Sequence, residues 1–141
     1  MNNNAVVGGL PESKVRRVRA FIDSNLHREL RLEELAAVTH MSPYHFARLF
    51  KRATGLSPHR FVVQRRIEAA TALLTESTSS ISSIAGAVGF RTASHFATTV
   101  RRITGMTPSA YRARRAVAEP GVGTPPIVAA DADETIPTLP K

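Results

Sequence analysis

The hydrophobic residues of this chain recur at helical spacing over most of its length. Val15, Val18, Phe21, Ile22 and Leu26 occupy one face of a first predicted helix, with arginines on the other faces. Six further apolar stripes follow, within residues 32–39, 43–53, 58–74, 81–88, 92–103 and from 108 onward. No stretch alternates convincingly at the two-residue period of a β-strand. The pattern therefore predicts an all-α fold.

Several predicted helices have recognisable ends. A residue with a side-chain hydroxyl stands at four predicted starts: Ser42, Ser57, Thr92 and Thr107. Such a hydroxyl caps the first turn, and proline follows three of the four at a position where its missing N–H costs nothing. Gly55 and Gly105 are the expected C-terminal stops of two of these helices.

The chain contains an internal repeat. Residues 41–61 (MSPYHFARLFKRATGLSPHRF) match residues 90–111 (FRTASHFATTVRRITGMTPSAY), and residues 35–41 match residues 84–90 just upstream. The second copy has one extra residue near Arg91. Each copy consists of a short helix, a tight turn and a longer helix. This is the helix-turn-helix pattern, whose second helix enters the major groove of DNA.

The first copy has an outer face suited to reading bases. Its inward stripe of Phe46, Leu49 and Phe50 leaves polar residues outside. Arg48 can reach two acceptors of a guanine, and a small residue allows contact with a thymine methyl. The predicted base contacts of this helix are Tyr44, Ala47 and Arg48.

The second copy presents smaller side chains on the face that is predicted to read bases. Its predicted base contacts are Ser94, Ala97 and Thr98. Capping hydroxyls at helix starts and basic side chains further along suit phosphate oxygens. The predicted phosphate contacts are Ser42, Lys51, Arg52, Ser57, Arg60, Arg91, Thr92, Arg101, Arg102 and Thr107.

Charge supports a polyanionic partner. The chain has 141 residues and a formal net charge of +8. Residues 11–115 hold 18 Lys and Arg against 7 Asp and Glu, whereas residues 116–141 hold one Lys against four acidic residues. A basic domain of this kind attracts nucleic acid, so double-stranded DNA is the expected partner.

Several other functional classes are not favoured. The chain has no cysteine, and it lacks paired catalytic carboxylates, a phosphate-binding glycine loop and a nucleophile elbow. We therefore expect no enzyme, no metal site and no cofactor. No apolar run reaches the ~18 residues of a membrane span, and no signal peptide is evident. We expect a cytoplasmic protein.

The chain resembles the DNA-binding domain of the AraC/XylS family of bacterial transcription regulators. The likeness rests on 48-RLFKRATGLSPHRF-61, 65-RRIEAATALL-74, 84-IAGAVGFRTASHF-96 and 105-GMTPSAYR-112. It implies seven helices, arranged as two homeodomain-like helix-turn-helix subdomains joined by a long linker helix. The two recognition helices would enter successive major grooves, one helical turn or ~34 Å apart. The resemblance also implies a monomer on DNA that associates with the bacterial nucleoid, with RNA polymerase as a further partner if the protein is an activator.

The second recognition helix departs from the pattern Phe-x-Arg-x-Phe-Lys that is common in this family. Thr98 stands where the arginine equivalent to Arg48 would be, and Val100 replaces the usual core phenylalanine. A bidentate arginine–guanine contact is worth ~1–3 kcal/mol, so we expect a strong first half-site and a weak second one. The smaller core residue predicts a less stable second subdomain.

Composition and the resemblance together predict the organisation of the chain. The Asn- and Gly-rich residues 1–11 are expected to form a flexible lead-in, and residues 117–141 are expected to form a disordered, proline-rich acidic tail. The predicted domain, residues 12–116, divides as first unit about 12–57, linker helix about 58–75 and second unit about 81–116. Many family members carry an N-terminal effector domain. The chain is expected to be either a stand-alone member or a C-terminal part of a longer regulator.

Two alternatives remain at the level of sequence. The weak second helix also fits an architectural protein that binds DNA without sequence preference, whose affinity would follow salt alone. An interaction module that modulates a full-length regulator is the other alternative, and it would bind DNA poorly on its own.

Overall fold

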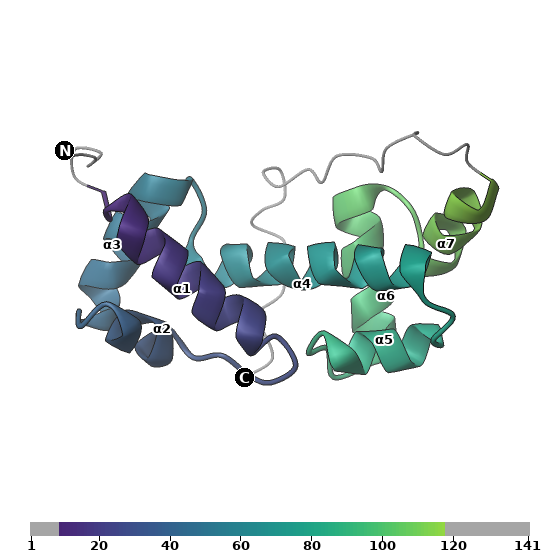
Figure 1. The fold of residues 1–141 in the computed structure, drawn as a ribbon, viewed down its shortest axis with the longest axis horizontal. Coiled ribbons are helices and arrows are strands. Elements are labelled where there is room, and N and C mark those ends of the chain that lie inside the picture. Colours follow the sequence, from purple (N-terminus) through teal and green to yellow (C-terminus); the bar gives the residue numbers. More distant parts are fainter. Residues whose placement is uncertain (1–8, 118–141) are drawn as a thin grey trace. The chain divides into compact units, whose positions relative to one another are not determined.

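The computed structural model describes residues 9–117, and these residues contain seven helices and no strand (Figure 1). The predicted all-α fold is confirmed for this part of the chain. The lead-in before residue 9 and nearly all of the tail predicted for 117–141 lie outside the described residues. The helices are α1 (Glu12–Ser24), α2 (Leu32–Val38), α3 (Pro43–Thr54), α4 (Pro58–Glu76), α5 (Ile81–Ala87), α6 (Ala93–Thr104) and α7 (Pro108–Val117).

The helices form two compact units, and the boundary between them falls inside α4, after Arg65. The first unit contains α1, α2, α3 and the beginning of α4. The second unit contains the rest of α4 with α5, α6 and α7. None of the helices within residues 9–117 has both the length and the apolar composition needed to cross a bilayer.

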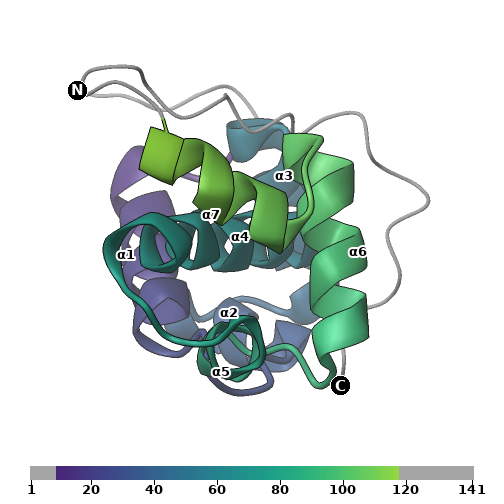
Figure 2. The same cartoon turned by 90° about the vertical axis from the view of Figure 1, so that its right-hand side faces the viewer.

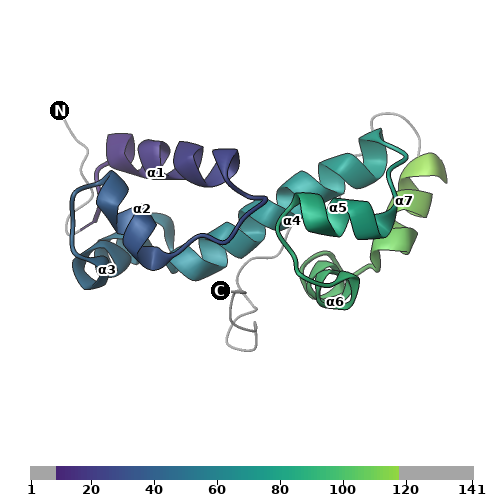
Figure 3. The ribbon, with the colours of Figure 1, turned by 90° about the horizontal axis from the view of Figure 1, so that it is seen from below.

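The first unit has an aromatic core. Figures 1 and 3 show α1, α2 and α3 gathered around the beginning of α4. Phe46 and Phe50 of α3 are fully buried, with ring centroids 5.3 Å apart. The Phe61 ring of α4 meets Phe50 edge-on at 5.0 Å. The apolar stripe of α3 therefore fixes this helix against α4 and leaves its opposite side exposed.

One expectation for the first helix is wrong. Leu26 was assigned to its apolar stripe, but α1 ends at Ser24. The backbone N–H of Asn25 bonds the Ile22 carbonyl instead of continuing the helical pattern, and the Asn25 side-chain amide bonds the Phe21 carbonyl. Helical spacing alone could not detect this competing side-chain bond.

The second unit packs a similar set of helices around different residues. Figure 2 shows α5, α6 and α7 around the end of α4. Phe96 and Val100 of α6 are fully buried, and Tyr111 of α7 is nearly so. The Phe90 ring, which precedes α6, lies 5.3 Å from the Phe96 ring. An aromatic residue in the turn thus contributes to this core.

Both longer helices of the repeat end in the same way. Gly55 and Gly105 have φ angles of 85° and 84°, in the left-handed region that only glycine adopts readily. The Thr54 hydroxyl donates to the Phe50 carbonyl and accepts the Leu56 N–H at 3.1 Å. Thr104 makes the equivalent pair of bonds. The predicted glycine stops are confirmed.

Candidate nucleic-acid interface

The exposed face of α3 carries the residues that the sequence analysis assigned to bases. Tyr44 is 74% exposed, Arg48 is exposed, and Ala47 between them is partly exposed. The guanidinium carbon of Arg48 lies 5.8 Å from the centroid of the Tyr44 ring. Because the buried stripe faces α4, this side of α3 projects polar groups into solvent. It can accommodate the edge of a nucleic-acid base.

Phosphate-binding groups flank this face. Ser42 caps α3 by accepting the His45 N–H at 3.3 Å, and Ser57 caps α4 by accepting the Arg60 N–H at 3.3 Å. Each hydroxyl still has its own proton to donate, which an anionic oxygen can accept. Lys51 and Arg52 in the last turn of α3 are exposed.

Arg60 is less accessible than the other predicted phosphate contacts of the first unit. Its side chain is partly buried, and its Nε atom is fully covered. Any approach to DNA would therefore use the outer end of the guanidinium group.

The exposed face of α6 has the same layout with shorter side chains. Ser94 and Thr98 are exposed, and Ala97 is partly exposed. Arg101, one turn further on, is exposed as well. Each of these hydroxyls has a single hydrogen to donate, so none can donate to two acceptors of a guanine at once.

The phosphate candidates of the second unit surround that face. Thr92 caps α6 by accepting the His95 N–H, and Thr107 caps α7 by accepting the Ala110 N–H, both at 3.0 Å. Arg91, just before the cap, is exposed, whereas Arg102 is partly buried. In each unit, every predicted site residue is exposed or partly exposed.

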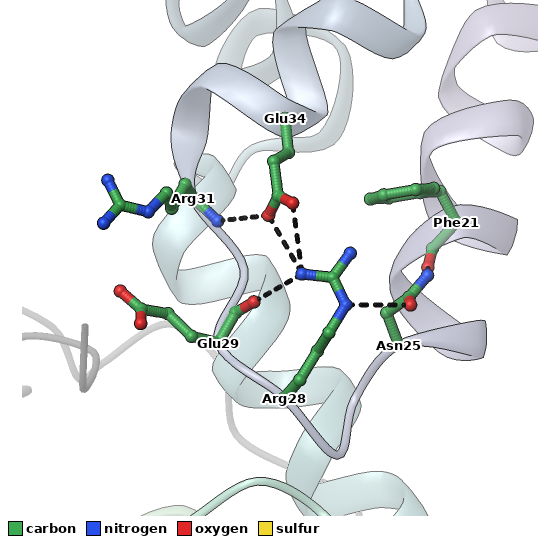
Figure 4. A network of polar contacts seen from close by, with 6 residues as sticks. All are labelled: Phe21, Asn25, Arg28, Glu29, Arg31 and Glu34. Atoms are coloured by element: carbon green, nitrogen blue, oxygen red, sulfur yellow. Dashed lines mark hydrogen bonds and ion pairs between the residues drawn. The ribbon is translucent and has the colours of Figure 1, made fainter.

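The site is supported by charged residues that the sequence analysis did not identify. In the first unit, Arg28 bonds both carboxylate oxygens of Glu34, at 3.2 and 3.1 Å, and also the Asn25 side chain and the Glu29 carbonyl (Figure 4). Glu34 in turn accepts the backbone N–H of Arg31 at 3.0 Å. This network fixes the loop between α1 and α2, the first helix of the motif.

The same network sets the ionisation of Glu34. The Arg31 backbone N–H is the main cause that lowers the pKa of this carboxyl below its ordinary value, and Arg28 lowers it further, while burial opposes both. The spacing Arg31-x-x-Glu34 is that of a capping box with an unusual first residue. That spacing was the available signal, but arginine at the capping position hid it.

Two adjacent arginines of α4 form hydrogen bonds within different units. Arg65 bonds Asp23 of α1 through two nitrogens, at 2.8 and 2.9 Å. Arg66 is only 1% exposed and donates to the Gly89 carbonyl at 3.4 Å, in the turn before α6. Burial lowers the pKa of the Arg66 guanidinium from its ordinary value. Arg66 therefore supports the backbone that leads into the second recognition helix.

The surroundings of His95, on α6, also determine its ring position and its pKa. Its ring meets the Phe90 ring edge-on, with centroids 5.3 Å apart. Burial, with a further contribution from the Arg102 charge, lowers the pKa of His95 below its ordinary value. A neutral His95 packs against the core and serves the scaffold of α6.

Comparison with known proteins agrees with this geometry. A family model described as a helix-turn-helix domain matches residues 35–114. The chain is 38% identical over 111 residues to the regulatory protein PocR of Salmonella typhimurium, covering 78% of this chain and 37% of PocR. It is 36% identical over 104 residues to the bifunctional transcriptional activator/DNA repair enzyme AdaA of Bacillus subtilis, covering 73% of this chain and 49% of AdaA. The chain thus spans less than half the length of either relative.

Solved structures extend the likeness to the fold. An AraC-type transcriptional regulator from Chromobacterium violaceum superimposes with a TM-score of 0.72 and 30% identity, covering 78% of this chain and 96% of that one. The DNA-binding domain of the global transcriptional factor AdpA, solved with a target DNA, gives a TM-score of 0.68 and 36% identity, covering 73% and 94%. From the family match and these likenesses, the chain belongs to the AraC-type helix-turn-helix family of transcription regulators.

Proposed function

We propose that this chain binds specific DNA sequences and regulates transcription, with α3 and α6 entering successive major grooves. The observation that carries the proposal is the exposed face of α3, where Tyr44 and Arg48 project opposite a buried aromatic stripe. A major groove ~12 Å wide admits one helix with such a face. The AdpA domain, which was solved with its target DNA, supports the same use of this fold.

The proposed roles follow from the chemistry of each exposed group. Long or small residues at the centre of each recognition helix contact bases, while cations and capping hydroxyls contact phosphates. The proposed base contacts are Tyr44, Ala47, Arg48, Ser94, Ala97 and Thr98. The proposed phosphate contacts are Ser42, Lys51, Arg52, Ser57, Arg60, Arg91, Thr92, Arg101, Arg102 and Thr107.

The two helices contribute unequally in this proposal. Arg48 can make two hydrogen bonds to a guanine, which are worth ~1–3 kcal/mol of discrimination. Thr98 at the equivalent place offers a single hydroxyl, so the second half-site is weaker and more tolerant. Arg91 and Arg101 keep that unit on the DNA backbone, where binding is independent of sequence.

The proposed partners are double-stranded DNA and, for an activator, RNA polymerase. The chain acts as a monomer on DNA in this proposal, because two reading helices in one chain already make an asymmetric site. The proposed activity of this chain is DNA recognition in the bacterial cytoplasm, without catalysis. The name of AdaA also includes a DNA repair activity. The chain covers 49% of AdaA, and we propose no such activity for the chain.

The test is selection of bound duplexes from a randomised pool at near-physiological salt, followed by sequencing. We expect a well-defined half-site containing a guanine and a weaker half-site about one turn, ~34 Å, away. The Arg48→Ala protein should lose ~1–3 kcal/mol at the selected site and relax its preference at that guanine.

Two results would contradict the proposal. Binding without enrichment that fades steeply with salt would identify an architectural protein. Little binding to any duplex would identify an interaction module instead. Lys51→Ala is the matched control, because removal of a phosphate contact should weaken binding to all sequences alike.

A further inference from the structure

The recognition helix of the first unit contains an aromatic–cation pair within its exposed face. Tyr44 and Arg48 are four residues apart, so they lie one above the other on the same side of α3. The guanidinium carbon is 5.8 Å from the ring centroid, which is within the range of a cation–π interaction. Tyr44 is 74% exposed. Among the described residues, it is one of only two large hydrophobic side chains that are exposed.

We propose that Tyr44 is a positioning residue for Arg48, and that it raises sequence specificity by holding the guanidinium group in place before DNA binds. This inference rests on the proposed function. In this arrangement Tyr44 contributes to recognition through Arg48, and this role replaces the separate base contact proposed above for Tyr44.

The geometry of the guanidinium group explains why an aromatic partner suits this role. All five N–H donors of arginine point outward in the plane of the group, and stacking occupies only its face. The donors therefore remain available to the two acceptors of a guanine. An ion pair with a carboxylate would occupy the same donors, and α3 contains no Asp or Glu at all.

Restriction of the side chain before binding accounts for the expected gain. A free arginine loses much of its rotamer freedom when it docks against a base, and this loss weakens binding. A ring that already confines the guanidinium group reduces the loss. An exposed cation–π contact stabilises by an amount that corresponds to about a 2- to 5-fold change in affinity.

The second unit provides an internal comparison. The positions equivalent to Tyr44 and Arg48 are Ser94 and Thr98, so both members of the pair are absent from α6. The caps of α3 and α6 have the same form, with a hydroxyl that accepts the backbone N–H of the third residue of the helix. The pair is therefore no requirement of the fold, and its presence in α3 points to DNA recognition.

The experiment is a double-mutant cycle on the full chain, measured as affinity for the selected duplex and for a duplex in which the Arg48-dependent guanine is 7-deazaguanine. The variants are Tyr44→Ala, Tyr44→Phe, Arg48→Ala and the double alanine. We expect Tyr44→Ala to lose about 2- to 5-fold on the guanine duplex. Tyr44→Phe, which keeps the ring, should remain close to the unaltered protein. In the Arg48→Ala background, loss of the tyrosine should change nothing further.

Lys51→Ala serves as the matched control, since Lys51 is exposed on the same face and is not among the cation–π contacts found within residues 9–117. Its loss should multiply with that of Tyr44→Ala, because the two act separately. Multiplied losses for Tyr44→Ala and Arg48→Ala would overturn the inference, and so would a Tyr44→Phe protein as weak as Tyr44→Ala. If the unaltered protein does not distinguish the selected duplex from random DNA, the proposed function fails first.

Discussion

The two helix-turn-helix units share their helix ends and differ in what the helices display. In both, a hydroxyl caps the reading helix and a glycine with positive φ stops it. On the exposed face, Tyr44 and Arg48 in α3 correspond to Ser94 and Thr98 in α6. Local hydrogen bonds at the ends set the backbone of each helix, so the exposed residues can change without altering that backbone.

The cores of the two units differ as well. The first unit packs the rings of Phe46, Phe50 and Phe61 against one another. The second has Val100 where Phe50 stands, and its extra aromatic ring comes from Phe90 in the turn. The smaller core residue is thus accompanied by a ring from another position. Each unit needs a filled interior, but no particular position has to supply it.

The largest effect is expected from truncation of the two equivalent core residues. Phe50→Ala should destabilise the first unit by ~3–5 kcal/mol, because it removes a ring that contacts two others. Val100→Ala removes two methyl groups and should cost about 2 kcal/mol in the second unit. Urea unfolding, with amide exchange read separately in α3 and α6, measures both. Equal losses of stability would mean that Val100 contributes as much to the second core as Phe50 does to the first.

A transfer of the exposed pair should produce the next largest effect. Ser94→Tyr combined with Thr98→Arg places the aromatic and cationic side chains at the same spacing on α6. We expect a new guanine preference in the weaker half-site, worth ~1–3 kcal/mol. Selection from a randomised pool would detect it.

The double substitution Ser94→Ala with Thr98→Ala is the control for this transfer, and it should produce no such preference. An unchanged selected sequence for the Tyr/Arg variant would show that the difference between the units lies in how α6 approaches DNA, and not in its side chains.

The features that sequence predicted well are those decided within a few residues. Ser42 and Gly55 each act on the helix turn beside them, so their roles can be derived from neighbouring letters. The outer face of α3 followed from the spacing of its buried phenylalanines. These signals require no knowledge of what packs against the helix.

The features that sequence missed depend on distant contacts. Arg66 lies four residues from both Val62 and Ala70 on the buried stripe of α4, yet its charge favoured exposure. The Gly89 carbonyl, 23 residues away, accepts a hydrogen bond from the buried guanidinium group and so helps to offset the cost of its burial. The link between Arg28 and Glu34 crosses a loop in the same way. Helical periodicity contains no information about such partners.

The smallest expected effect is a pH dependence confined to the second unit. The pKa of His95 is lowered in the folded protein, chiefly by burial, so the unfolded chain takes up a proton more readily near pH 6.5. The stabilisation from neutral His95 is fully present above about pH 6.5 and is lost as the pH falls below that value towards the folded pKa.

Amide exchange in α6, measured between pH 7.5 and 5.0 and corrected for its intrinsic rate, should report this loss. His95→Gln cannot be protonated and should remove the His95-dependent part of the slope. His45→Gln, at the equivalent exposed position of α3, should leave that slope unchanged. A slope that survives His95→Gln would assign it to another group. A slope that disappears would show that His95, which is partly buried against the Phe90 ring, is the group that titrates, whereas the equivalent His45 is exposed.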